Sequence, residues 1–324
     1  MRNQTGNSRD FSFIDLFAGI GGFRLALEQL NSECVFTSEW DKDSAKVYFN
    51  NFDDLPLGDI TKIDESTIPE HDVLCAGFPC QAFSISGKRL GFADTRGTLF
   101  FDIERIVKQK KPKVVFLENV KNLLKHDNER TFNTILQKLE ELNYQVFFKL
   151  LRSSDFGVPQ ARERVYIVGF RNDLNIKSFK FPEPISETRT VRDILEKHPP
   201  ENTFIDRDDI VINDHNKTIN DTRKPHRVGT ISKGGQGERI YSIDASGITL
   251  SAFGGGPGAK TGAYLVDGRV RKLTPREAAR MQGFPETFIL DEKINKALKQ
   301  FGDSVSVPVI KKIYESILLS LNSK

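Results

Sequence analysis

The sequence has few cysteines, a single tryptophan and almost no excess of charge of either sign. Three cysteines in 324 residues are too sparse, and odd in number, for the disulfide framework of a small secreted protein. No apolar run approaches the 18 residues that a membrane-spanning helix needs, and residues 1–11 show no apolar signal segment. These absences argue against a disulfide scaffold and a membrane protein, and they predict a soluble cytoplasmic protein.

The small net charge of +3 is unevenly distributed along the chain. Residues 221–282 contain 11 Lys and Arg against 5 Asp and Glu, which is a local net charge of +6. Residues 229–268 hold 11 of the 24 glycines, and such a segment cannot be helical. The second half therefore predicts a basic, glycine-rich region with short strands, which we expect at 238–243, 248–253 and 263–266.

The first half alternates short apolar segments with amphipathic ones, which predicts a mostly parallel α/β sheet with helices on both faces. We expect strands at 11–17, 34–38, 73–78, 113–117, 144–151 and 164–170, and helices at 23–30, 99–108, 132–142, 274–282 and 308–321. No helix separates the last two of these strands, so we expect an antiparallel pair at that edge. Thr274 and Pro275 are typical of the first residues of a helix.

The first strand leads into the glycine turn AGIGG, whose Gly19, Gly21 and Gly22 allow a ligand to approach the backbone. Glu39 lies 18 residues after Gly21, where a carboxylate can accept hydrogen bonds from ribose hydroxyls. Trp40 could stack on an adenine. The pattern favours an adenosine-containing ligand over a tight turn beside a solvated acid. It leaves a dinucleotide and S-adenosylmethionine both open.

Two further strands end in reactive side chains. Cys80, in the motif GFPCQ, follows one strand, and the nearby cations of the next loop favour its thiolate form. Glu118, in ENV, follows another, so the pair predicts a nucleophile beside an acid. The alternatives are a structural cysteine, a role that suits Cys75 better, and an ordinary exposed acid. A metal site formed by His71, Cys75 and Cys80 matches no common zinc spacing.

Two arginines precede the last strand of the first half, in the motif QARER. Arg162 and Arg164 are two residues apart, so on a strand they share a face. There they could bind an anion or a carbonyl oxygen, although surface salt bridges would also explain them.

The motif order FAGIGG, GFPCQ, ENV, QARER, a basic glycine-rich region and QFGDSV resembles the cytosine-C5 DNA methyltransferase family over nearly the whole chain. Stretches such as LCAGFPCQAFSISGK and KGGQGERIYS are similar to the bacterial HhaI-type branch of that family, which methylates the inner cytosine of GCGC. The resemblance implies a Rossmann-like catalytic domain, residues 1–180 and 303–324, and a smaller β-rich target-recognition domain, residues 181–302, which includes a hinge region.

The resemblance also implies S-adenosylmethionine (SAM) as cofactor, S-adenosylhomocysteine (SAH) as product, and no metal. Phe17 would pack on the adenine, Glu39 would bind the ribose and Asp59 the adenine amino group. The remaining cofactor residues implied by the family are Gly19, Gly21, Gly22, Trp40, Ile60, Pro79, Asp303 and Val305.

In such a site Cys80 would add to C6 of a cytosine that has been flipped out of the duplex. Glu118 would bind and protonate N3, and Arg164 would contact O2, with Arg162 nearby. Addition at C6 makes C5 electron-rich enough to accept a methyl group. Loss of the C5 proton and expulsion of Cys80 would then release 5-methylcytosine.

The basic region would bind double-stranded DNA. Gln236 would enter the space left by the flipped base, and Arg239 would recognise a guanine through O6 and N7. Thr249, Ser86 and Arg96 would be further DNA contacts that position the duplex.

One residue departs from the family pattern, because Asp303 stands where the family usually has Asn, and Asp cannot donate a hydrogen bond at neutral pH. A binding protein without activity is therefore one alternative; a tRNA cytosine-C5 methyltransferase and an NAD-dependent oxidoreductase are others. We expect a cytoplasmic, prokaryotic monomer with no obligate protein partner. A cognate restriction endonuclease would act on the same site without being bound to it.

Overall fold

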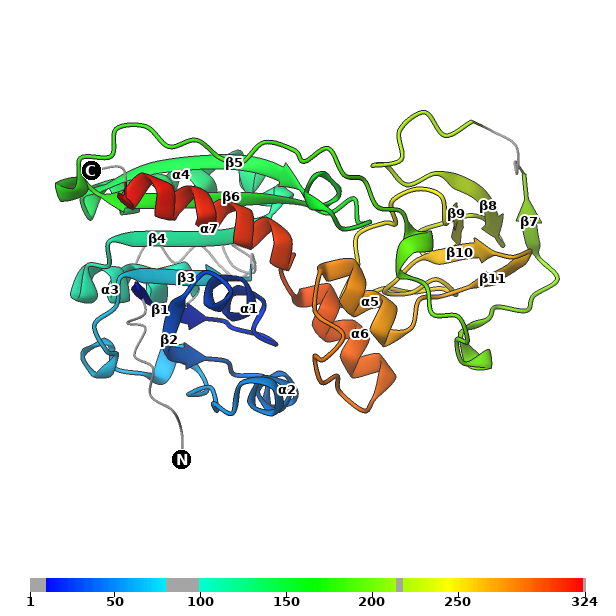
Figure 1. Cartoon of the computed structure of the whole chain (residues 1–324), viewed down its shortest axis with the longest axis horizontal. Helices are drawn as coiled ribbons and strands as arrows, with labels where there is room; N and C mark the ends of the chain where they lie inside the picture. Colours follow the sequence, from blue (N-terminus) through cyan, green and yellow to red (C-terminus); the bar gives the residue numbers. More distant parts are fainter. Residues whose placement is uncertain (1–9, 80–98, 214–217, 323–324) are drawn as a thin grey trace, which may run out of the picture.

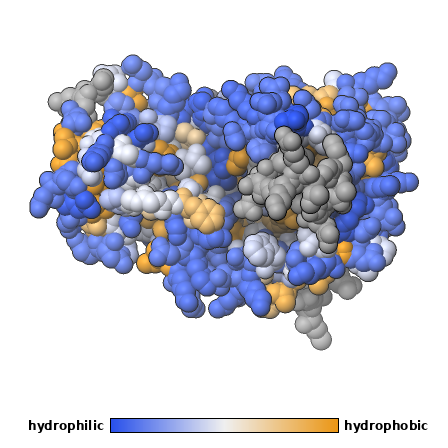
Figure 2. Space-filling view, turned by 180° about the vertical axis from the view of Figure 1, so that it is seen from behind, coloured by the Kyte–Doolittle hydropathy of each residue, from blue (hydrophilic) through white to orange (hydrophobic). Residues whose placement is uncertain are grey.

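The computed structural model describes residues 10–79, 99–213 and 218–322. Two β-sheets lie toward opposite ends of an elongated molecule, and helices α5 (Pro275–Gln282) and α6 (Ile294–Asp303) lie between them (Figure 1). Within the described ranges, no helix combines the length and the apolar character that a bilayer crossing requires. The face seen in Figure 2 is mostly hydrophilic, with apolar residues scattered over it.

The larger sheet has six strands in the order β2-β1-β3-β4-β6-β5. Their bounds are β1 (Phe11–Leu16), β2 (Ser32–Ser38), β3 (Val73–Gly77), β4 (Val114–Val120), β5 (Tyr144–Arg152) and β6 (Glu163–Arg171). β1 pairs in parallel with β2 and β3, and β3 with β4, whereas β6 runs antiparallel to both β4 and β5. The predicted antiparallel pair is confirmed. The insertion of β6 between β4 and β5 was not predicted, because strands far apart in the chain pair there.

Helices cover both faces of this sheet, as the sequence predicts, because alternate strand residues are apolar on both sides. On one face Phe13 and Phe116 pack in the same cluster as residues of α1 and α7. On the other face Ile14 and Val115 pack with residues of α3 and α4. The helices of this layer are α1 (Gly22–Glu28), α2 (Lys42–Phe52), α3 (Leu99–Lys110), α4 (Arg130–Glu141) and α7 (Val307–Asn322). The predicted sheet with helices on both faces is confirmed.

The smaller sheet has the order β11-β10-β9-β8-β7 and a separate small core that includes Ile231, Ile240 and Val270. Its strands are β7 (Ile210–Ile212), β8 (Arg227–Ile231), β9 (Arg239–Ser242), β10 (Ala263–Val266) and β11 (Arg269–Arg271). Glycine is required where two loops touch, because a Cβ on Gly237 would lie 2.1 Å from the carbonyl oxygen of Gly255. The glycine-rich composition therefore reflects close backbone packing.

The structure differs from the sequence expectations in several elements. Helices α2 and α6 and strands β7, β8 and β11 were not predicted, and residues 248–253 do not form the predicted strand. The Leu250 N–H donates to Oε1 of Gln160, and the Leu250 carbonyl accepts a hydrogen bond from Arg162. Because side chains satisfy these backbone groups, the segment needs no strand partner. Short 3-10 helices connect other elements: η1 (Ile60–Lys62), η2 (Glu65–Thr67), η4 (Lys121–Lys125), η5 (Ser153–Phe156), η6 (Asn172–Leu174), η7 (Val191–Ile194) and η8 (Glu201–Thr203).

Helix α5 begins as predicted, with Thr274 as the N-cap and Pro275 in the first turn. The Thr274 hydroxyl accepts from the backbone N–H of Glu277, and the Glu277 carboxylate accepts from that of Thr274. Glu277 also forms a buried two-bond ion pair with Arg271, at 2.7 and 2.8 Å. This contact ties strand β11 to helix α5.

The boundaries predicted for the recognition domain stay a prediction. Phe284 and Phe301, which fall inside the predicted range 181–302, pack in the same hydrophobic cluster as Phe23 of α1. The structure therefore places the chain around α5 and α6 against the larger sheet.

One carboxyl group lies in the core of the larger sheet without a hydrogen-bond partner in the described parts of the chain. Asp15 of β1 is fully buried, and neither of its carboxyl oxygens is satisfied. Burial raises the pKa of Asp15 to about 8. The group is therefore mostly protonated in the folded protein at neutral pH and ionised in the unfolded chain.

We expect this carboxyl group to make stability fall as pH rises. Between about pH 4 and about pH 8 the folded state binds the extra proton, so the free energy of unfolding drops by up to about 1.4 kcal/mol per pH unit. Asp15→Asn should remove this drop, as measured by urea unfolding across that range. Asp208→Asn, which removes an exposed carboxylate, controls for lost charge. Parallel profiles for Asp15→Asn and the wild type would contradict this account.

Candidate active site

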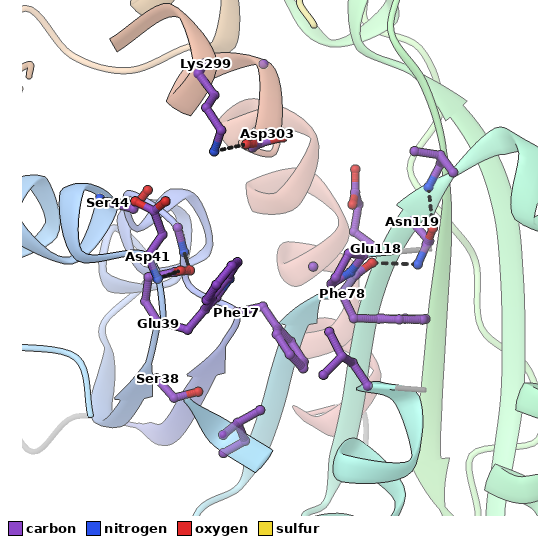
Figure 3. A pocket seen from close by; sticks show the side chains of 18 of the residues that line it. Phe17, Ser38, Glu39, Asp41, Ser44, Phe78, Glu118, Asn119, Lys299 and Asp303 are labelled. Carbon is purple, nitrogen blue, oxygen red and sulfur yellow. Dashed lines mark hydrogen bonds and ion pairs between the residues drawn. The ribbon is translucent and has the colours of Figure 1, made fainter. Parts of the chain in front are cut away.

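A cavity of about 630 Å³ lies at the carboxyl ends of strands β1 to β4 (Figure 3). The structure brings together here many of the residues singled out in the sequence: Phe17, Gly19, Glu39, Trp40, Asp59, Ile60, Pro79, Glu118, Arg162, Arg164 and Asp303. Figure 3 shows Glu39 and Asp41 on one side of the cavity and Glu118 on the other. A position at strand ends is where α/β sheets bind ligands.

The glycine turn and Glu39 form one hydrogen-bonded unit. The Gly19 N–H donates to Oε2 of Glu39 at 2.8 Å, and the Asp41 N–H donates to Oε1 at 2.7 Å. Burial raises the pKa of Glu39, although these two bonds oppose that effect. A carboxylate has about four lone-pair sites. Glu39 therefore holds the ends of β1 and β2 in place and keeps acceptor capacity at the cavity.

Gly21, Gly22 and Val305 do not line the cavity but support the turn from behind. A Cβ on Gly21 would lie 2.3 Å from the Phe52 ring, and one on Gly22 would lie 2.6 Å from Cγ2 of Val305. Gly21 also has a φ of 88°, a conformation that favours glycine. Close packing, more than ligand contact, explains these residue types.

Two exposed aromatic side chains also line the cavity. Trp40 and Phe253 both line it and are each 74% exposed. Asp59 caps η1 and accepts hydrogen bonds from the backbone N–H and the hydroxyl of Thr61. Burial raises the pKa of Asp59, but the bonds from Thr61 and Lys62 together keep it below its ordinary value. Flat apolar rings beside an ionised acceptor suit a heterocyclic ligand.

Glu118 and Arg164 meet at the adjoining wall. Val120 of β4 lies opposite Arg164 of β6 in the antiparallel register, which brings Nε of Arg164 to 3.1 Å from Oε1 of Glu118. Glu118 is 7% exposed, and its Oε1 makes no aligned hydrogen bond among the described residues. Oε1 is therefore held by the arginine, and Glu118, as a residue that lines the cavity, presents its carboxyl group to a ligand beside that cation.

Arg162 lines the same cavity as Arg164, but its guanidinium binds backbone carbonyl oxygens instead of a carboxylate. Its guanidinium donates to the carbonyl oxygens of Gly302 at 3.1 Å and Ser304 at 2.7 Å, and more weakly to Leu250. Burial and the nearby charge of Arg164 lower the pKa of Arg162 to about 10, so it stays charged at neutral pH. Its hydrogen bonds join chain segments, and this contact could not be read from the motif.

Several residues that line the cavity were not assigned to it from sequence, among them Asn119 and Lys299. The Asn119 amide donates to the Phe78 carbonyl at 2.8 Å and fixes the chain just before Pro79 and Cys80. Lys299 forms an ion pair with Asp303 at 3.1 Å. Only the four-residue spacing on one helix could have indicated this pair.

The remaining predicted site residues fall into two groups. Cys80, Ser86 and Arg96 lie outside the described residues. Gln236 and Arg239 are exposed near the start of β9 in the smaller sheet, and the Thr249 hydroxyl donates to the carbonyl of Ala161. Their contacts with a ligand stay predictions.

Comparison with known proteins agrees with this geometry. Residues 11–319 match the family model described as C-5 cytosine-specific DNA methylase. The chain therefore belongs to the cytosine-C5 DNA methyltransferase family and is an enzyme of that class.

Individual relatives are similar over nearly their full length. The chain is 54% identical over 314 residues to the type II methyltransferase M.HhaI of Haemophilus parahaemolyticus, covering 96% of this chain and 95% of that protein. It is 47% identical to M.SsoII of Shigella sonnei, covering 99% of this chain and 83% of that one. A mutant DNMT2 of Spodoptera frugiperda has the same fold, with a TM-score of 0.74 at 19% identity, over 95% of this chain and 99% of that one. The predicted Rossmann-like fold is confirmed.

We expect Gly22→Ala to destabilise the protein by about 1–3 kcal/mol, because its methyl group would overlap Cγ2 of Val305. Adding Val305→Ala should restore part of the loss by removing the overlapping atom. Gly255→Ala, whose Cβ would have nothing within 4 Å, is the matched control. Thermal unfolding measures all three. Equal stability of Gly22→Ala and Gly255→Ala would show that the turn tolerates a side chain.

Proposed function

We propose that this enzyme methylates C5 of the inner cytosine of GCGC in double-stranded DNA and uses SAM as methyl donor. The single observation that carries the proposal is one cavity that joins the glycine turn and Glu39 to the Glu118–Arg164 pair. A cofactor bound beside the glycine turn and Glu39 would meet a cytosine bound beside Glu118 and Arg164 at one edge of the sheet.

The residues present fit SAM. Glu39 keeps acceptor capacity for ribose hydroxyls, the Phe17 ring lines the cavity for the adenine, and Asp59 offers an acceptor for its amino group. When bound, SAM supplies an electrophilic methyl group, and SAH remains afterwards. No metal forms part of the proposal.

The chain's own residues account for the cytosine chemistry. Cys80 follows Pro79 directly and would add its thiolate to C6. Glu118, almost fully buried in the cavity wall, would act in its protonated form and donate its carboxyl proton to N3 as the thiolate adds. Arg164 would contact O2 and hold Glu118 in place. C5 would then accept the methyl group. Loss of the C5 proton to water, with return of the N3 proton to Glu118, would let the thiolate leave. Arg162 supports this wall from behind.

The smaller sheet would recognise the sequence of the DNA. Gln236 is exposed in the loop before β9 and Arg239 is exposed at the start of that strand, next to the close packing of Gly237 on Gly255. Residues 221–282, which include both, carry a net charge of +6. Ser86, Arg96 and Thr249 would position the backbone. The GCGC site rests on the resemblance of the segment KGGQGERIYS. We further propose that residues 1–180 with 303–324 and residues 181–302 act as the catalytic and recognition domains.

The relatives' names support a type II modification enzyme. Its cognate restriction endonuclease would act on the same site as a separate protein, and the methyltransferase would act as a monomer in a prokaryotic cytoplasm.

Transfer of labelled methyl from SAM to unmethylated duplex DNA, with tRNA alongside and bisulfite sequencing afterwards, tests the proposal. We expect 5-methylcytosine at the inner cytosine of GCGC only. Cys80→Ser should abolish transfer, and Glu118→Gln should slow it by about 100-fold or more, while both still bind duplex DNA. Label in tRNA alone, or full activity of Cys80→Ser, would refute the proposed substrate or mechanism.

We expect Arg239→Ala to lose discrimination at one guanine of the site. A bidentate arginine–guanine contact contributes about 1–3 kcal/mol, so the preference for GCGC over a site altered at that guanine should fall by about 10-fold or more. Competition between the two duplexes measures it. An unchanged preference would mean that another side chain recognises this base. Arg227→Ala, which removes a neighbouring cation of β8, controls for lost charge.

A further inference from the structure

An ion pair on helix α6 lies in the cavity wall. Nζ of Lys299 and Oδ2 of Asp303 are 3.1 Å apart, one helical turn from each other, and both residues line the cavity (Figure 3). Their side chains are 39% and 53% exposed, so the pair faces the space that a ligand would occupy.

The structure holds Asp303 firmly at this place. Arg162 donates to the carbonyl oxygens of Gly302 and Ser304, the residues on either side of it. A Cβ on Gly302 would lie 2.3 Å from the backbone nitrogen of Ala252, so the chain is tightly packed there. The backbone that carries the Asp303 carboxylate is therefore fixed at the cavity.

The pair is electrostatically coupled to the proposed cofactor residues. Burial lowers the pKa of Lys299, but the bond to Asp303 and the charges of Asp41 and Glu39 together raise it. The charge of Lys299 in turn acts on Glu39. Among the described residues, Lys299 is the one lysine that lines the cavity.

The whole wall carries more negative than positive charge. Five carboxylate residues line the cavity in the described parts of the chain, against three cationic ones: Glu39, Asp41, Asp59, Glu118 and Asp303, and Arg162, Arg164 and Lys299. SAM carries a sulfonium, an ammonium and a carboxylate and so has a net charge of about +1 at neutral pH, whereas SAH is neutral overall. A wall of this sign favours the cation.

We infer that the Lys299–Asp303 ion pair sets how strongly this site prefers the cationic methyl donor over its neutral product, an inference that rests on the proposed use of SAM. Asp303 adds a negative charge that favours SAM, and Lys299 limits that preference. The aspartate at this position, where the family usually has Asn, thus affects how strongly the product SAH competes with SAM for the site.

The two halves of the pair should act with opposite signs. Asp303→Asn leaves the Lys299 charge uncompensated, so the ratio of the SAH to the SAM dissociation constant should fall. Lys299→Gln leaves the Asp303 charge uncompensated, so the same ratio should rise. Each change should be roughly two- to tenfold, the size expected of one charge across a solvated cavity, and smaller at high salt. The double variant should return close to the wild type.

Isothermal titration of the full-length protein with SAM and with SAH, at low and high salt, tests this. Lys296→Gln is the matched control. Lys296 lies on α6, as Lys299 does, and forms an ion pair with Asp43 of α2, but it does not line the cavity. Two results would overturn the inference and leave the proposed function intact. Either all variants bind both ligands with the same ratio of dissociation constants, or the ratio changes in the same direction in both single variants. A wild type that binds neither ligand would overturn the proposed cofactor and this inference with it.

Discussion

The buried guanidinium of Arg162 is the interaction on which the site depends. It joins the start of β6 to Leu250 and to the chain around Asp303, which are distant in sequence. Hydrogen bonds from a charged donor contribute about 1.5–3 kcal/mol each and offset the cost of burying the cation. Through them the end of α6 and the chain at Leu250 are fixed against the edge of the larger sheet.

The cavity that results keeps polar groups partly unsatisfied. Glu118 is buried beside Arg164 yet has an oxygen without an aligned hydrogen bond, and Glu39 uses one bond on each oxygen. Partly satisfied polar groups reduce the stability of the protein without ligand. They strengthen ligand binding, because a donor on the ligand can complete their hydrogen bonds without rearrangement. The excess of carboxylates gives the same wall a preference for a cation. Geometry and charge thus point to one ligand class.

Much of this site could be predicted from the sequence, because each motif follows an apolar segment that becomes a strand, and strand ends converge. The glycine turn, Glu39, Glu118 and Arg164 all meet at the cavity. The two arginines of QARER were treated alike, since residues two apart on a strand share a face. Both do line the cavity, but their partners differ: Arg164 pairs with Glu118, whereas Arg162 binds backbone carbonyl oxygens, which the motif does not indicate.

The sequence by itself determined which residues could carry chemistry and at which strand ends they stand, because apolar periodicity and glycine act locally. Only the tertiary structure decided which of them meet. Three features join segments far apart in the chain: the hydrogen bond from Asn119 to Phe78, the contacts of Arg162 and the position of β6. The packing of α6 likewise places the Lys299–Asp303 pair in the cavity wall. Such contacts depend on how helices and sheet pack together, and local pattern contains no measure of that packing free energy.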